Sequence, residues 1–111
     1  MAHALRGKIE EIVKSKPVVI FMKGSPTFPQ CGFSARAVEV LKTAGVQDLA
    51  SVDVLSDDPL WEALEEYSQW FTVPQVFIGG QFVGGSDIVT EMFENGELQE
   101  LLKKHTQRIA P

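Results

Sequence analysis

Helix-like and strand-like stretches alternate along this chain, and their order restricts its fold more than any other feature. Apolar residues recur at helical spacing from Leu5 to Val13, and Pro17 separates that stretch from a short apolar strand. The remaining stretches predict the element order αβαβαββαα. The predicted elements are a helix over 5–13, a strand over 18–21, a helix over 33–44, a strand over 52–54, a helix over 59–67, strands over 76–78 and 81–83, and two short helices after 87 that break at Asn95-Gly96.

A β-hairpin follows the alternating part of the chain. Two strand-like runs, 76–78 and 81–83, are separated only by Gly79-Gly80, a sequence typical of a two-residue turn. A βαβ unit followed by a hairpin and a covering helix predicts an α/β protein with a thioredoxin-like fold, in which helices flank a small mixed four-stranded sheet. Because the chain has 111 residues, of which 44% are hydrophobic, we expect one domain spanning residues 1–111.

The charge and hydropathy of the chain argue against two classes of partner. The formal net charge is −5 at pH 7, whereas proteins that bind phosphate backbones normally carry a basic stripe. The longest apolar run near the N-terminus covers only residues 17–22, and residues 1–3 begin neither an apolar signal nor an Arg-rich presequence. We therefore expect a soluble protein that binds neither nucleic acid nor a membrane.

The single cysteine, Cys31, follows a loop after the first strand and directly precedes a helical stretch. A thiol at a helix N-terminus faces backbone N–H groups without intrahelical partners, which stabilise its thiolate and make it a nucleophile and a metal ligand near neutral pH. A lone cysteine is otherwise commonly a small buried hydrophobe, but Gly24, Pro29 and Gly32 indicate an exposed loop. One cysteine also rules out an intrachain disulfide, which fits a reducing compartment.

Two other loops have features that suit ligand binding. In Thr72-Val73-Pro74, a cis bond before the proline would turn the backbone N–H and C=O of Val73 outward, where they can pair with a bound peptide. In Gly84-Gly85-Ser86-Asp87, a helix N-terminus offers N–H groups to a carboxylate, and Asp87 can accept from an ammonium group. Taken alone, this second loop is more simply explained as a turn with an N-cap.

Together these loops resemble those of a monothiol glutaredoxin of the CGFS type. The similarity covers almost the whole chain, and the combined motif is highly specific. The matching residues, in order, are Lys23-Gly24, Pro29-Gln30-Cys31-Gly32-Phe33-Ser34, Thr72-Val73-Pro74-Gln75 and Gly84-Gly85-Ser86-Asp87-Ile88.

The resemblance implies a glutathione site and a 2Fe-2S cluster shared between two protomers, with roles in cluster storage and transfer and in iron homeostasis. It implies BolA-type proteins and iron-sulfur apoproteins as partners, and the mitochondrial matrix, plastid stroma or bacterial cytoplasm as the compartment. Cys31 would ligate iron. The residues implied in glutathione binding are Lys23, Gly32, Phe33, Thr72, Val73, Pro74, Gly85, Ser86 and Asp87.

The number of thiols supports this interpretation independently of the family. A 2Fe-2S cluster typically takes four thiolates, and this chain supplies one. Two chains and two external thiols would complete the ligand set. In glutathione, the central backbone would pair with Val73, the γ-glutamyl end would meet Ser86 and Asp87, and the glycine carboxylate would meet Lys23.

Four positions depart from the family pattern. Phe71 replaces a proline in the loop before Pro74, and Ser86 stands where many members have a second cysteine. Trp61 and Glu65 replace an arginine and a lysine that help to hold the glycine carboxylate of glutathione. A carboxylate at Glu65 would repel that group, so a related thiol with a less acidic or cationic end is an alternative ligand. We expect Trp61 to serve in packing, as we do Trp70.

Two classes of function compete at this point. We prefer a cluster carrier, in which Cys31 is a metal ligand, over a glutathione-dependent oxidoreductase, in which Cys31 attacks a glutathionylated protein. The loop before Cys31 is longer than in glutaredoxins specialised for reduction, and in the resembling family this goes with weak reductase activity. A regulatory module that binds partners through the same surface is a third possibility.

Overall fold

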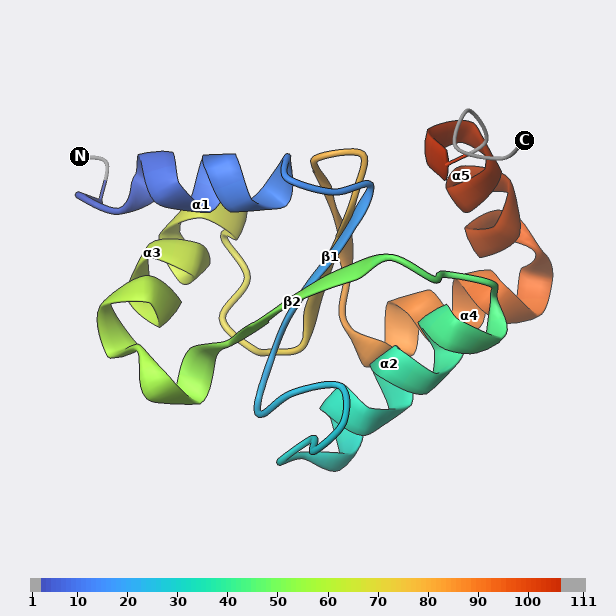
Figure 1. Ribbon diagram of the computed structural model, residues 1–111, viewed down its shortest axis with the longest axis horizontal. Helices are drawn as coiled ribbons and strands as arrows, with labels where there is room; N and C mark the ends of the chain where they lie inside the picture. Colours follow the sequence, from blue (N-terminus) through green and yellow to red (C-terminus); the bar gives the residue numbers. More distant parts are fainter. Residues whose placement is uncertain (1–2, 107–111) are drawn as a thin grey trace.

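Four strands form the central sheet, whose order is β2-β1-β3-β4 (Figure 1). The strands are β1 (Val18–Met22), β2 (Leu49–Asp53), β3 (Gln75–Ile78) and β4 (Gln81–Gly84). In this computed structural model, which describes residues 3–106, β1 pairs parallel with β2 and antiparallel with β3, and β3 pairs antiparallel with β4. The parallel β1–β2 pair and the β3–β4 hairpin agree with the sequence prediction.

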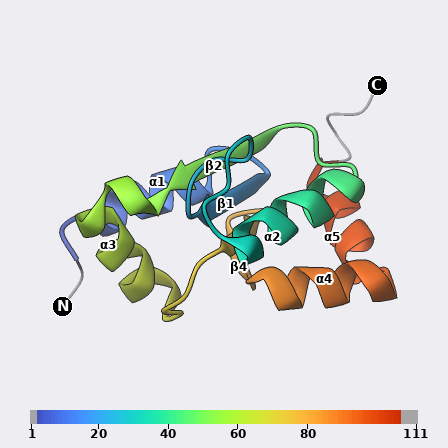
Figure 2. The same cartoon turned by 90° about the horizontal axis from the view of Figure 1, so that it is seen from below.

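Helices cover both faces of the sheet, as Figures 1 and 2 show. The helices are α1 (Arg6–Val13), α2 (Gly32–Thr43), α3 (Asp58–Ser68), α4 (Ser86–Asn95) and α5 (Glu97–Thr106), with a short 3-10 turn, η1 (Val54–Ser56). α1 and α3 lie together on one face, while α2, α4 and α5 lie on the other. This is the thioredoxin-like arrangement that the sequence predicts. Within residues 3–106, no helix combines the length and apolar character needed to cross a membrane.

β1 is buried on both of its faces, which explains its continuous apolar sequence. Val18, Ile20 and Met22 pack into the core beneath α2, α4 and α5. Val19 and Phe21 point the other way and pack beneath α1 and α3. The central strand therefore fixes the loop that follows it, and that loop carries Cys31.

The predicted helix boundaries agree closely with the structure. The carboxylate of Asp57 caps α3 by accepting a hydrogen bond from the backbone N–H of Leu60 at 3.1 Å. Gly96 ends α4 in a left-handed conformation with φ of 88°, which glycine adopts without strain.

The prediction of a strand over 52–54 was wrong at both ends, since β2 already begins at Leu49. β2 stops at Asp53, and Val54 begins the 3-10 turn η1. The reason is local, because the side chain of Asp53 accepts a hydrogen bond from the backbone N–H of Leu55 at 2.9 Å. That bond turns the chain away from the sheet.

Candidate functional site

The sheet register brings three segments of the chain to one edge of the fold. Phe21 of β1 lies beside Gln75 of β3, so the loop after β1 meets the residues that precede β3. Val76 of β3 pairs with Gly84 at the end of β4, which brings the start of α4 to the same edge. The three loops that stand out in the sequence therefore converge.

A groove of about 420 Å³ opens where the three loops meet. Gly32 alone among the predicted site residues is absent from its lining. It is the exposed first residue of α2, and within residues 3–106 a Cβ added there would meet no atom within 4 Å. The groove is lined by Lys23, Cys31, Phe33, Trp61, Trp70, Phe71, Thr72, Val73, Pro74, Gly85, Ser86, Asp87 and Ile88.

Cys31 is half-buried and occupies the N-cap position of α2 with an extended backbone. Its side chain forms no capping hydrogen bond of ordinary geometry. Even so, the pKa of the Cys31 thiol lies below its ordinary value, chiefly because the backbone N–H of Ser34 interacts with the sulfur. Partial burial acts in the opposite direction, while the N–H of Phe33, the ammonium of Lys23 and the hydroxyl of Ser34 lower the pKa further. The thiolate is thereby favoured, as expected for a nucleophile or a metal ligand.

Ser34 connects the thiol to the loop that precedes it. Its side chain is fully buried, and its hydroxyl oxygen accepts a hydrogen bond from the backbone N–H of Lys23 at 3.2 Å. Sequence reasoning assigned Ser34 no role of its own. The signal was present, since a serine three residues after the N-cap can bond back to the preceding loop.

The loop from Lys23 to Cys31 is closed by its own backbone. The N–H of Gln30 donates to the carbonyl oxygen of Lys23 at 2.8 Å, and Gly24 forms a bridge with Pro29. Gly24 has φ of 88°, and a Cβ added there would lie 2.4 Å from the carbonyl oxygen of Phe28. Glycine is therefore required at this position.

The second segment of the groove is held by a buried glutamine. The Val73-Pro74 peptide bond is cis. Next to it, the Gln75 side chain is fully buried, and its amide nitrogen donates to the carbonyl oxygens of Trp70 at 2.8 Å and of Thr72 at 3.1 Å. Sequence reasoning placed Gln75 in the motif but missed that it shapes this wall of the groove.

The third segment is the N-terminus of α4. Gly85 occupies the N-cap position and has no side chain that could cap the helix. The hydroxyl oxygen of Ser86 is buried, lines the groove and has no hydrogen-bond partner in the described residues. Asp87 is exposed in the first turn. An uncapped helix start beside an unpartnered hydroxyl is suited to an anionic or polar ligand group.

Three of the four departures from the family pattern lie in the groove. Trp61, Phe71 and Ser86 line it, as does Trp70. Trp61 also packs against the core cluster beneath α1 and α3, as the sequence predicts. Glu65 is half-buried one turn beyond Trp61 and is not part of the lining. The charged residues of the lining are Lys23 and Asp87.

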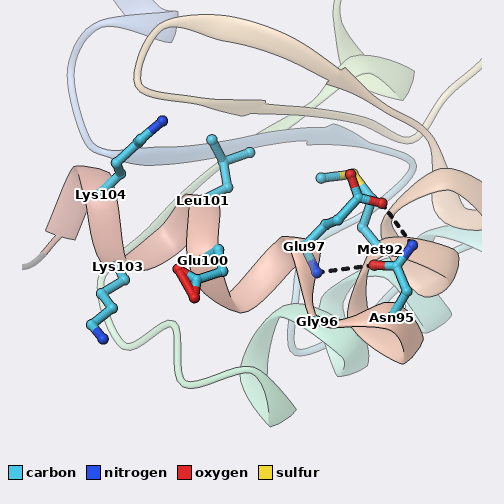
Figure 3. Close-up of a pocket in the computed structure, with 8 residues that line it drawn as sticks. All are labelled: Met92, Asn95, Gly96, Glu97, Glu100, Leu101, Lys103 and Lys104. Carbon is cyan, nitrogen blue, oxygen red and sulfur yellow. Dashed lines mark hydrogen bonds between the residues drawn. The ribbon is translucent and has the colours of Figure 1, made fainter.

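A larger hollow, of about 800 Å³, lies at the junction of α4 and α5 and shares no lining residue with the groove (Figure 3). Two hydrogen bonds join Asn95 and Glu97 there. The Asn95 side-chain amide donates to the Glu97 carboxylate at 2.6 Å, and the backbone N–H of Glu97 donates to the Asn95 side-chain oxygen at 2.9 Å. These bonds join two helices, and no thiol lies among the lining residues. The groove beside Cys31 is therefore the candidate site.

Potential metal ligands are not clustered in the part of the chain that the structure describes. Residues 3–106 contain no group of three or more His, Cys, Asp or Glu side chains placed to hold a metal ion. Cys31 can supply one thiolate ligand to a metal centre.

The fold and the groove define a thioredoxin-like protein with a single thiol at the start of a helix. The glutaredoxin family model matches residues 18–83. Monothiol glutaredoxin-5, mitochondrial, of Schizosaccharomyces pombe is 48% identical over 101 residues, which are 89% of this chain and 69% of that protein. The chain therefore belongs to the glutaredoxin family, within its monothiol branch.

Two further comparisons agree with this assignment. The monothiol glutaredoxin ycf64-like protein of Synechocystis is 45% identical over 98 residues, which are 88% of this chain and 91% of that protein. The crystal structure of a buckwheat glutaredoxin–glutathione complex superposes with a TM-score of 0.79 at 29% identity, covering 89% of this chain and 87% of that one.

Proposed function

We propose that this protein binds glutathione in the groove and, as a pair of chains, carries a 2Fe-2S cluster that it stores and transfers to iron-sulfur apoproteins, with a role in iron homeostasis. The observation that carries the proposal is the meeting of three features in one groove. These are a thiol with a lowered pKa, the backbone of Val73 before Pro74, and the uncapped start of α4.

The groove offers residues of complementary chemistry to each part of glutathione. The central peptide can pair with the backbone of Val73, and the γ-glutamyl end can meet Ser86 and Asp87. The glycine carboxylate is assigned to Lys23, the one cation of the lining. The glutathione bound to the similar buckwheat protein supports this ligand. Phe33, Thr72 and Gly85 complete the proposed contacts.

The cluster fits the chemistry of Cys31. A thiolate supplies one of the four ligands of a 2Fe-2S cluster, and a lowered thiol pKa favours that form. Two copies of the chain and two glutathione molecules would supply all four. When bound, the cluster is the cargo that an apoprotein receives, and this chain's residues hold it through Cys31 and through the glutathione that the groove binds.

The proposal extends to partners and compartment. We propose BolA-type proteins and iron-sulfur apoproteins as partners of the cluster-bound pair. The thiolate needs a reducing compartment to stay free, such as the mitochondrial matrix, the plastid stroma or a bacterial cytoplasm. The Schizosaccharomyces pombe relative is named as a mitochondrial protein, which supports the first of these.

Anaerobic reconstitution with iron, sulfide and glutathione tests the proposal. The wild type should gain the visible absorption of a 2Fe-2S cluster and become a dimer by native mass spectrometry, and chelation should return it to the monomer. Cys31→Ser should stay colourless and monomeric, whereas Thr27→Ala, an exposed change in the same loop, should behave as the wild type. A cluster retained by Cys31→Ser, or found on a single chain, would refute the proposed ligand set.

A glutathione-dependent oxidoreductase is the second candidate, because the lowered pKa of Cys31 also suits a nucleophile. The Cys31 thiolate would attack the glutathione sulfur of a glutathionylated protein, forming a Cys31–glutathione disulfide and releasing the protein thiolate. A second glutathione thiolate would then attack the glutathione sulfur of that disulfide, giving oxidised glutathione and restoring Cys31. Turnover of a glutathionylated protein by the apo form, absent in Cys31→Ser, would favour this candidate.

A further inference from the structure

We propose that Trp61 is a positioning residue whose indole ring holds the ammonium group of Lys23 at the thiol end of the groove. This inference deepens the proposed function, because it concerns the same groove. Its test uses the thiol of Cys31 alone and requires neither glutathione nor a cluster.

The geometry of the pair carries the first step. The Lys23 ammonium nitrogen lies 5.8 Å from the centroid of the Trp61 ring. A cation within about 6 Å of a ring centroid is attracted by the ring's quadrupole, and tryptophan attracts it most strongly among the aromatic residues. Both residues line the groove, although they come from different elements, the loop after β1 and helix α3.

The ring is anchored, whereas the lysine is not. Trp61 is partly buried and packs against the core cluster beneath α1 and α3. The Lys23 side chain makes no ion pair or hydrogen bond within residues 3–106, unlike Lys14 and Lys16, which pair with Glu10 and Asp48. A lysine has a flexible four-carbon stem, so contact with a fixed ring restricts where its ammonium group lies.

The position of this ammonium group matters at two places. It helps to lower the pKa of the Cys31 thiol, and Coulombic attraction falls as the charges separate. It is also the one cation of the groove lining, so it determines where an anionic group of a ligand can be held. A ring that keeps the ammonium group inside the groove therefore acts on both the thiol and the ligand.

A simple packing role explains Trp61 less well. Its indole nitrogen is buried and has no acceptor within residues 3–106. A buried donor without a partner costs free energy, which phenylalanine or leucine would avoid because their side chains have no polar atom. The attraction between the ring face and Lys23 offsets part of this cost.

The pH dependence of alkylation by iodoacetamide measures the Cys31 pKa without ambiguity, because the chain has one cysteine. Trp61→Leu should raise that pKa at low salt, and Trp61→Phe, which keeps a ring, should raise it less. Lys23→Gln should raise it as well. Adding Trp61→Leu to Lys23→Gln should produce no further shift, because the ring would have no ammonium group to hold.

A matched control comes from the same helix. Tyr67 of α3 also carries a cation over its ring, the guanidinium of Arg6 at 4.8 Å, but it does not line the groove. Tyr67→Leu removes a comparable ring and cation contact and should leave the Cys31 pKa unchanged. Thermal unfolding of each variant verifies that it is folded. An unchanged pKa in Trp61→Leu, or an equal shift in the Lys23→Gln background, would overturn the proposal.

Discussion

Replacing Lys23 with alanine should weaken the binding of glutathione to the apo protein by ten-fold or more. The side chain is half-buried, lines the groove and has no carboxylate partner within residues 3–106. Its ammonium group is therefore free to pair with the glycine carboxylate of glutathione. Asp87, the other charged residue of the lining, cannot take its place because it carries the opposite charge.

The magnitude follows from the partial burial of this cation. Hydrogen bonds to charged groups typically contribute about 1.5 to 3 kcal/mol when they are partly desolvated, which corresponds to a loss of roughly 10- to 150-fold in affinity. An exposed ion pair would contribute only about 0.2 to 1 kcal/mol. A loss below about five-fold would thus indicate that the carboxylate remains in open solvent.

Calorimetric titration of glutathione into the apo protein, at low and high salt, measures the effect. Lys16→Ala is the matched control, because Lys16 is exposed, pairs with Asp48 and lies outside the groove lining. A glutathione analogue amidated at its glycine carboxyl provides the second arm. The wild type should prefer the free carboxylate, and Lys23→Ala should bind both forms equally. If Lys23→Ala still prefers the carboxylate, another group holds it and the assignment to Lys23 fails.

Four other outcomes follow from the site. Ser34→Ala should raise the pKa of Cys31 and slow its alkylation at neutral pH, because it removes the serine hydroxyl that helps to lower that pKa. The pKa of Cys31 is lower in the folded than in the unfolded protein, so the stability that the thiolate contributes is complete above the unfolded pKa and is lost as pH falls through the folded pKa. The free energies of unfolding of the wild type and Cys31→Ser, measured in urea across this range, should therefore diverge as pH rises. Gly24→Ala should destabilise the fold by more than about 1 kcal/mol, because of its positive φ and the clash with Phe28, whereas Gly7→Ala, on α1 with no atom within 4 Å, should be neutral or stabilising in the same urea assay. Glu65→Lys should strengthen glutathione binding by no more than about five-fold, and only at low salt, because Glu65 lies outside the groove lining; a larger gain by calorimetry would place Glu65 at the ligand.

The sheet and the three loops could be predicted because local signals mark them. The run 18–21 is continuously apolar, and Gly79-Gly80 separates two strand-like runs. Short stretches of sequence are therefore enough to predict β1 and the β3–β4 hairpin. The end of β2 was harder to predict from the sequence. Whether Val54 continues the strand depends on the hydrogen bond that the backbone N–H of Leu55 donates to the side chain of Asp53. The alternation of apolar residues does not reveal that bond.

The lining of the groove shows where sequence reasoning stops. Glycine, proline and cysteine marked the loops that contain Cys31, Pro74 and Gly85, because these residue types have few structural explanations. Trp61 and Glu65 lie one turn apart on α3, and the sequence could not decide which of them faces the groove. That choice depends on how α3 is rotated against the core, a matter of tertiary packing.

The carboxylate of Asp53, on β2, anchors the loop from Lys23 to Cys31. Asp53 lies beside Met22 in the β1–β2 pair, and one of its oxygens accepts hydrogen bonds from the backbone N–H groups of both Gly24, at 3.0 Å, and Leu55. For protein engineering, this means that residues 23–31 cannot be transferred alone, because their conformation depends on a residue outside the segment. If the segment were moved into another protein without an acidic residue on the neighbouring strand, the N–H of Gly24 would lose its acceptor. The loop that holds the Cys31 thiol would then be less rigid.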